Sequence, residues 1–132
     1  MVDPRTRVSV NILIVDDSAS LRGLLRSRIE QNPELKVCGE AENGQIALEK
    51  VKALNPDVVI LDWLMPVMSG LEAARQITRV APNTAMLMLT LHCSKQLLEE
   101  AKAVGIQRVF SKAESLADLI TSVRNVVADP GV

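Results

Sequence analysis

Short apolar runs alternate with longer amphipathic segments along the whole chain. The runs 12–15 and 58–61 contain only Val, Ile and Leu, as expected for central strands of a parallel sheet that is buried on both faces. One helical stripe consists of Leu21, Leu24, Leu25 and Ile29. The alternation predicts an α/β fold in which crossover helices cover both faces of one sheet. We expect strands over residues 8–16, 35–41, 58–62, 85–90 and 108–111, and helices over residues 18–31, 44–54, 69–80, 94–104 and 115–127.

Residues that start or stop helices support these boundaries. Ser18 can cap the first helix, and a proline follows the predicted end of each of the first three helices. Gly105 follows the fourth helix and is expected to adopt a left-handed conformation there. Ser115 and Asp118 form a weak capping box for the last helix.

The size and charge of the chain narrow its class. With 132 residues, 48% of them hydrophobic, we expect a single domain over residues 1–132 with a core over about 8–127. The net charge of -1 gives no general attraction to nucleic acid or to an anionic membrane. No apolar stretch is long enough for a signal peptide or a membrane span, so we expect a cytoplasmic protein. Cys38 and Cys93 are expected to be reduced, small buried residues.

Polar residues stand where the predicted strands end. They are Asp16, Asp17, Asp62, Thr90 and Lys112. In an open α/β sheet the carboxyl ends of the strands form the ligand crevice, so these side chains should converge. Three carboxylates at one edge repel one another unless some are protonated or a multivalent cation lies between them. Mg²⁺, or Mn²⁺ in its place, suits such a set of hard oxygen ligands.

The same residues are suited to phosphoryl chemistry. Asp62 ends a central strand and precedes a loop, which makes it the candidate nucleophile for in-line attack on phosphorus. Lys112 and Thr90 would supply a cation and a hydroxyl donor to the phosphoryl oxygens. Taken singly, each residue has a simpler explanation, such as helix-dipole charges, a solvated lysine or a β-forming threonine. Their position at the ends of separate strands favours the joint interpretation.

Two segments then indicate a family. Residues 11–18, NILIVDDS, and residues 56–70, PDVVILDWLMPVMSG, resemble the first strand with its acidic pair and the phosphorylation segment of two-component response-regulator receiver domains. The resemblance runs from about residue 8 to 127. It implies a flavodoxin-like, doubly wound five-stranded parallel sheet in the order 2-1-3-4-5. It also implies that Asp17, Asp62 and the backbone carbonyl of Leu64 hold Mg²⁺, that Asp16 assists through water, and that Thr90 and Lys112 are the switch residues.

The resemblance also implies partners and a mode of action. A sensor histidine kinase or a histidine phosphotransfer protein would phosphorylate Asp62, and the surface of the fourth helix, fifth strand and fifth helix would change. Such a domain is a phosphoacceptor rather than an enzyme, with self-catalysed phosphotransfer and dephosphorylation at most. Residues 70–77 are similar to receivers that precede helix-turn-helix output domains, and no such domain follows here. We expect an output partner or fused DNA-binding domain outside this chain, dimerisation on phosphorylation as one response, and no membrane or direct nucleic-acid binding.

Two positions depart from the family pattern. Val109 stands where receivers usually carry the switch aromatic, three residues before the lysine. Phe110 follows it, but alternation along a strand places Phe110 on the opposite face. Ala113 follows Lys112 where related receivers have proline or an acidic residue. The phosphoryl chemistry should survive both changes, and Val109 leaves open whether the usual aromatic readout operates.

Three other classes of protein remain as alternatives. A flavin- or nucleotide-binding module would need a glycine-rich phosphate loop after the first strand, where this chain has Asp16 and Asp17. A metal-dependent phosphatase with an aspartyl nucleophile would need an acid/base aspartate at the position of Leu64. A receiver-like scaffold that binds partners without being phosphorylated is the third alternative, and Val109 keeps it open.

Overall fold

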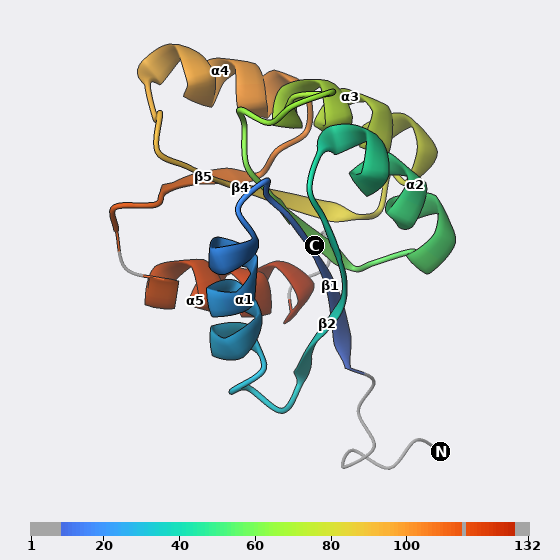
Figure 1. The fold of residues 1–132 in the computed structure, drawn as a ribbon, viewed down its shortest axis with the longest axis vertical. Helices are drawn as coiled ribbons and strands as arrows, with labels where there is room; N and C mark the ends of the chain where they lie inside the picture. Colours follow the sequence, from blue (N-terminus) through green and yellow to red (C-terminus); the bar gives the residue numbers. More distant parts are fainter. Residues whose placement is uncertain (1–8, 115, 129–132) are drawn as a thin grey trace.

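The fold is one parallel sheet between two layers of helices. The computed structural model describes residues 9–114 and 116–128. The five strands lie in the order β2-β1-β3-β4-β5, and every adjacent pair is parallel (Figure 1). The predicted fold class is therefore confirmed. The elements are β1 (Val10–Val15), α1 (Ala19–Ile29), β2 (Leu35–Ala41), α2 (Gly44–Leu54), β3 (Val58–Leu61), α3 (Gly70–Val80), β4 (Ala85–Thr90), α4 (Lys95–Ala103), β5 (Arg108–Ser111) and α5 (Leu116–Ala128).

The predicted boundaries differ from these by no more than two residues. Ser18 caps α1 as expected, and Ser69 and Ser94, which the predicted ranges include in their helices, are N-caps as well. Each has extended backbone, and its hydroxyl accepts a hydrogen bond from the third amide of its helix. Gly105 has a φ of +95°, which confirms its predicted left-handed conformation. The predicted capping box involves Ser115, which lies outside the described residues.

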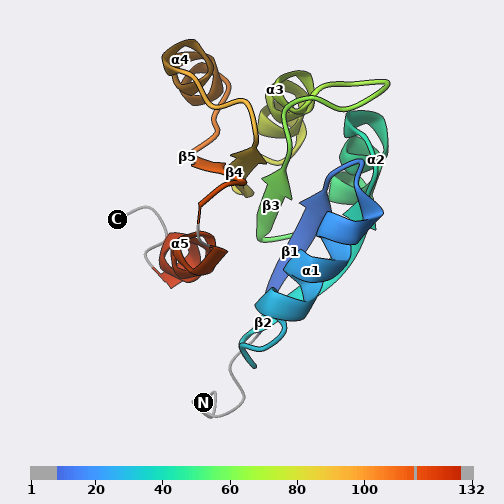
Figure 2. The ribbon, with the colours of Figure 1, turned by 60° about the vertical axis from the view of Figure 1, so that its left-hand side comes forward.

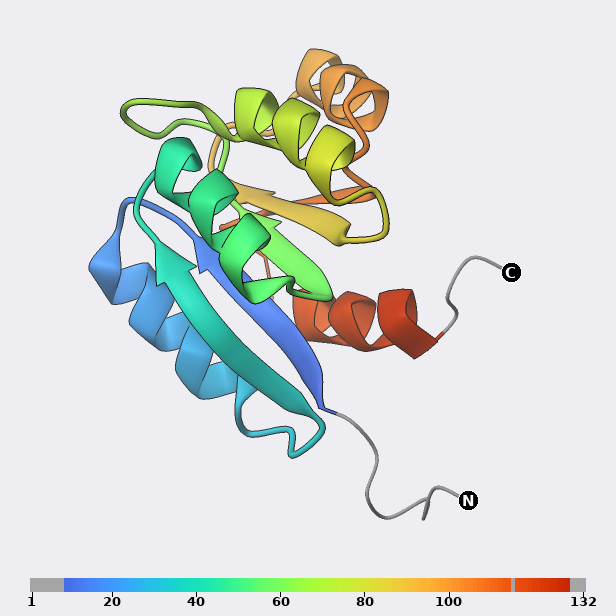
Figure 3. The same cartoon turned by 90° about the vertical axis from the view of Figure 1, so that its right-hand side faces the viewer.

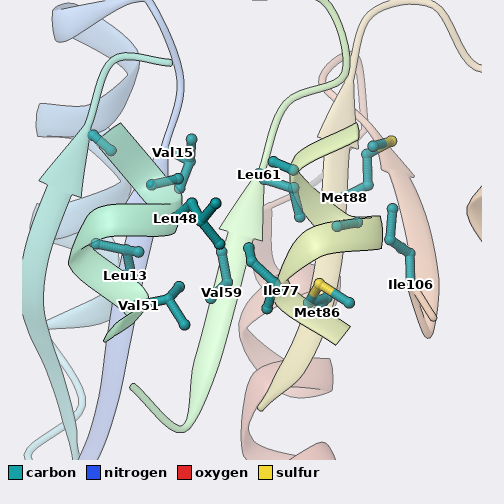
Figure 4. Close-up of a cluster of buried hydrophobic side chains, with 14 of the residues drawn as sticks. Leu13, Val15, Leu48, Val51, Val59, Leu61, Ile77, Met86, Met88 and Ile106 are labelled. Atoms are coloured by element: carbon teal, nitrogen blue, oxygen red, sulfur yellow. The ribbon is translucent and has the colours of Figure 1, made fainter. Parts of the chain in front are cut away.

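Each face of the sheet carries its own hydrophobic cluster. The first cluster joins the sheet to α2, α3 and α4, and the second joins it to α1 and α5 (Figures 2 and 3). In Figure 4, side chains of β1, β3 and β4 meet Leu48 and Val51 from α2 and Ile77 from α3. β3 and β4 are buried throughout, because helices cover both faces of the sheet and the side chains on both faces are almost all apolar. Within the described residues, none of the helices has the length and apolar character needed to cross a bilayer.

Two sequence expectations about burial are wrong. Leu24 is exposed on α1, because Leu25 and Ile29 already face the sheet and Leu24 lies outside that stripe. Cys93 is also exposed, because it lies in the loop that follows the end of β4. Cys38 is half-buried at an irregularity of β2, where the pairing with β1 moves from Val37 to Gly39 and leaves Cys38 as an extra residue. Both cysteines are free thiols, as expected.

Candidate functional site

The carboxyl ends of four strands meet at one edge of the sheet. Val15 pairs with Leu61, so the residues that follow them, Asp16 and Asp62, are neighbours. The Asp62 amide donates to the Val15 carbonyl at 3.0 Å, which continues the ladder by one more bond. The ends of β4 and β5 meet in the same way, since the Lys112 amide donates to the Thr90 carbonyl at 2.9 Å. The topology thus brings the predicted residues to one edge.

An acidic cluster occupies this edge. One carboxylate oxygen from each of Asp16, Asp17 and Asp62 lies within 4.8 Å of the others. Asp16 and Asp62 are buried, whereas Asp17 is exposed. Burial raises the pKa of Asp16, and its hydrogen bond from Lys112 offsets part of that effect. Hard oxygen donors at this spacing fit a small divalent cation, and the exposed side of the cluster leaves room for the waters that Mg²⁺ retains.

Lys112 neutralises part of this cluster. Its ammonium lies 2.8 Å from Asp16 Oδ2 and 3.0 Å from Asp62 Oδ2. Burial alone would lower the pKa of Lys112, but the hydrogen bonds to Asp16 and Asp62 raise it above the ordinary value. Lys112 therefore keeps its positive charge beside the carboxylate oxygens of Asp62, the candidate nucleophile.

Thr90 is the last residue of β4 and is completely buried. Its hydroxyl accepts a hydrogen bond from the His92 amide at 3.2 Å, while its carbonyl is bonded to Lys112. Thr90 therefore connects the β4–α4 loop to the residue that contacts Asp62. His92 itself is exposed.

The start of α3 approaches the backbone of Asp62 very closely. The Gly70 amide donates to the Trp63 carbonyl at 2.7 Å, and the Trp63 amide donates to Asp62 Oδ1 at 2.7 Å. A Cβ atom built on Gly70 would lie 1.9 Å from the Asp62 carbonyl oxygen. Position 70 therefore requires a glycine. Because glycine has no side chain, the start of α3 can approach closely enough to bond the backbone next to Asp62. Leu64 lies two residues beyond Asp62 in the same loop, with its side chain exposed.

The loop between β3 and α3 contains a strained residue. Val67 has a φ of +69° and is 80% exposed, and the Met68 amide donates to the Pro66 carbonyl at 2.7 Å across it. A bond between residues two apart defines a γ-turn, and positive φ at its centre is a costly conformation for a β-branched residue.

Replacing Val67 with asparagine is expected to raise the free energy of unfolding by about 1 kcal/mol, because asparagine tolerates positive φ. Urea denaturation of the metal-free protein measures the change. Val67→Ile keeps the β-branch and should leave the stability near that of the wild type. If the asparagine variant is not more stable than the isoleucine variant, Val67 stores no strain.

Val109 and Phe110 lie on opposite faces of β5, as the strand alternation predicted. Val109 is half-buried and packs against the cluster of α2, α3 and α4, whereas Phe110 is buried in the cluster of α1 and α5. The Arg108 guanidinium lies 4.8 Å from the centre of the Phe110 ring and donates to the Ser122 hydroxyl. Phe110 is thus enclosed between β5 and α5, on the opposite face of the sheet from Val109.

Arg22 contacts the site although no sequence pattern singled it out. Its guanidinium donates to the backbone carbonyl of Asp16 and to a carboxylate oxygen of Glu40 on β2. Both contacts depend on a side chain that spans from α1 to the end of β1, which periodicity does not reveal.

Comparisons with known proteins agree with this geometry. The family model of the response regulator receiver domain matches residues 12–124. The protein-glutamate methylesterase/protein-glutamine glutaminase 1 of Methanosarcina acetivorans is 42% identical over 123 residues, which cover 86% of this chain and 35% of that protein. The transcriptional regulatory protein LnrK of Bacillus subtilis is 37% identical over 117 residues, which cover 89% of this chain and 53% of LnrK. The response regulator domain of Thermotoga maritima CheB has a TM-score of 0.83 at 31% identity, with 92% of this chain and 98% of that domain covered.

The chain belongs to the response regulator receiver domain family, the regulatory module of two-component signalling. It spans about a third of the length of the methylesterase and about half of the length of LnrK. The esterase and transcriptional activities in those names are therefore properties of longer proteins.

Proposed function

We propose that this chain is a single phosphoacceptor domain, over residues 1–132, that takes a phosphoryl group on Asp62 and changes its surface as a result. One observation carries the proposal: the Asp62 carboxylate lies within one acidic cluster and is bonded to the ammonium of Lys112 at 3.0 Å. An incoming phosphoryl group carries charged oxygens. Its transfer therefore requires an anionic nucleophile and a nearby cation that stabilises this charge, and Asp62 and Lys112 would supply them.

A divalent cation, Mg²⁺ or Mn²⁺, completes the proposed site. Asp17, Asp62 and the backbone carbonyl of Leu64 would hold it, with Asp16 acting through water. The cation would neutralise charge on the phosphoryl oxygens. The donor set supports this assignment, because all three carboxylates offer oxygen within 4.8 Å of one another.

In the proposed transfer, an oxygen of Asp62 forms a bond to phosphorus while the phosphorus–nitrogen bond of a phosphohistidine donor breaks and its electron pair stays on the imidazole. Lys112 would move from the carboxylates to the new phosphoryl oxygens. The Thr90 hydroxyl, which is bonded to the His92 amide in this structure, would turn toward the same oxygens. Because Thr90 and Lys112 are joined through their backbones, we expect both loops to shift together.

The shift would reach the surface formed by α4, β5 and α5, which lies next to Thr90 and Lys112 in the chain. We propose a sensor histidine kinase or a histidine phosphotransfer protein as donor, and a cytoplasmic location, where free thiols such as Cys93 persist. The output would be a partner, a second copy of the domain, or a fused DNA-binding or catalytic domain. The two named relatives support a fused output domain of either kind, since LnrK is named as a transcriptional regulatory protein and the Methanosarcina acetivorans protein as a methylesterase.

The proposal is tested by incubating the wild type and an Asp62→Asn variant with Mg²⁺ and a small-molecule acyl phosphate. Intact mass spectrometry should show the mass of one phosphoryl group added to the wild type and none added to the variant. Omission of Mg²⁺ should abolish the gain. Size-exclusion chromatography of the same samples would then show whether phosphorylation drives dimerisation.

An unmodified wild-type protein, under conditions that phosphorylate another receiver domain, would refute the phosphoacceptor role. The second candidate, a scaffold that works without phosphorylation, would then take its place. Val109 is the observation that favours the scaffold. Receivers usually carry an aromatic ring at this position, which moves together with the switch threonine, and valine has no such ring.

A further inference from the structure

A charge network on α1 and β2 connects to the acidic site through Arg22. Glu40 accepts from Arg22 Nε at 2.9 Å and from Arg26 Nε at 2.8 Å. Arg26 also lies 3.8 Å from Glu30, so the four side chains carry two positive and two negative charges. Burial alone would raise the pKa of Glu40, but the hydrogen bonds from Arg26 and Arg22 lower it. Glu40 is therefore charged at neutral pH, and the network adds no net charge beside the acidic cluster.

The two arginines of this network differ in exposure and in the groups that they contact. The Arg22 side chain is only 16% exposed, and its guanidinium also donates to the Asp16 carbonyl. The Arg26 side chain is 40% exposed, and within residues 9–114 and 116–128 its ion pairs are with Glu30 and Glu40. Arg22 therefore links Glu40 on β2 to the backbone at the end of β1, whereas Arg26 contacts Glu40 and Glu30 without reaching that backbone. The chain thus offers a matched pair of residues in the same network.

The bond from Arg22 restrains the peptide group that precedes Asp17, one of the proposed cation ligands. The Asp16 carbonyl and the Asp17 amide belong to one planar peptide group, so fixing the carbonyl fixes the plane from which Asp17 projects. The Ser18 amide donates to Asp16 Oδ1 at 2.8 Å and holds the other side of this turn. The Asp17 side chain is exposed and is not held by core packing, so its backbone is the part that neighbouring groups can restrain.

We propose that Arg22 is a positioning residue for the cation site: braced by Glu40, it holds the Asp16–Asp17 peptide so that the Asp17 carboxylate faces Asp62. Fixing this peptide in advance reduces the ordering that the loop undergoes when a cation binds. The inference rests on the proposed metal-dependent function, but its test does not require phosphorylation.

The test compares Arg22→Met with Arg26→Met. Methionine keeps an unbranched apolar stem and removes every donor, and urea denaturation verifies that both variants fold. Trp63 is half-buried next to Asp62, so its fluorescence can follow a titration with MgCl₂. Arg22→Met is expected to weaken Mg²⁺ binding about tenfold, the usual scale for losing a group that orients a metal ligand. Arg26→Met should bind Mg²⁺ within about twofold of the wild type, because Arg26 does not reach Asp16.

A second readout uses the metal-free protein. Hydrogen exchange of the Ser18 amide should be faster in Arg22→Met than in the wild type and unchanged in Arg26→Met, because Arg22, unlike Arg26, contacts the turn that this amide closes. Arg22→Lys keeps one donor on a long stem and should bind Mg²⁺ more tightly than Arg22→Met.

Three results would overturn the proposal: equal Mg²⁺ affinity in Arg22→Met and the wild type, an equal loss in Arg26→Met, or unchanged exchange at Ser18. Failure of the phosphoacceptor function is recognised separately, because the wild type would then gain no mass even though the amide exchange still responded to Arg22→Met.

Discussion

Replacing Gly70 with alanine is expected to lower the free energy of unfolding by about 3 kcal/mol, the upper range for forcing extra volume into a packed site. The new methyl group would lie 1.9 Å from the Asp62 carbonyl oxygen, which is backbone and cannot rotate away. Either α3 or the Asp62 segment must move. Because the Gly70 amide also holds the Trp63 carbonyl, we expect phosphorylation by a small-molecule donor to fall sharply as well. Urea denaturation and intact mass measure the two effects.

Gly23 provides the control. It also lies in a helix, but a Cβ built there meets no atom within 4 Å. Gly23→Ala is therefore expected to stabilise the protein by about 0.5–1 kcal/mol, the usual gain from replacing glycine inside a helix. If Gly70→Ala were no less stable than Gly23→Ala, the close approach of α3 to Asp62 would not constrain the site.

Replacing Lys112 with methionine is expected to destabilise the metal-free protein by about 2 kcal/mol at pH 7, because Asp16 and Asp62 would lose their shared cation. Breaking a fully buried ion pair costs more than this, but here the cluster is open to solvent on the side of the exposed Asp17. Added MgCl₂ should stabilise the variant more than it stabilises the wild type, since no ammonium would then compete for the same oxygens. Urea denaturation with and without MgCl₂ measures both effects.

The pH dependence of the Lys112 contribution has a definite sign. A lysine whose pKa is raised by folding stabilises the folded state fully below its ordinary pKa of 10.5 and loses that effect as the pH rises through the folded-state pKa. The difference between the wild type and Lys112→Met should therefore be complete at pH 7 and, on the alkaline side, shrink above about pH 10.5. Lys95→Met, at an exposed position on α4, should show no such difference. A difference that disappears near neutral pH would contradict the assignment to Lys112.

Most of the site could be predicted because it follows from strand order. Asp62 and Lys112 come from strands that are not adjacent in the sheet, yet both stand at carboxyl ends, and the parallel topology brings all such ends together. The separation of Val109 from Phe110 was also predictable, because it depends only on the alternation along a strand. Local periodicity and the position of polar residues were sufficient for both inferences.

The features that escaped prediction depend on distances between elements. Arg22 contacts Asp16 and Glu40 through a long side chain whose direction no sequence pattern gives. The positive φ of Val67 runs against the preference of its residue type, so the surrounding loop must impose it. Leu24 and Leu25 are adjacent, and helical spacing alone does not show which of them faces the sheet. In the structure Leu25 is buried and Leu24 is exposed.

The irregularity at Cys38 has a consequence for the behaviour of the protein at high concentration. β2 is an outermost strand, and a flat outermost strand can recruit strands of other molecules and seed fibrils. The extra residue interrupts the regular pairing of β2, and the exposed Lys36 puts a charge on it. On the opposite margin, β5 is only four residues long. Both outer strands are therefore poor templates for a sixth strand, which limits edge-to-edge pairing of the sheet with other molecules.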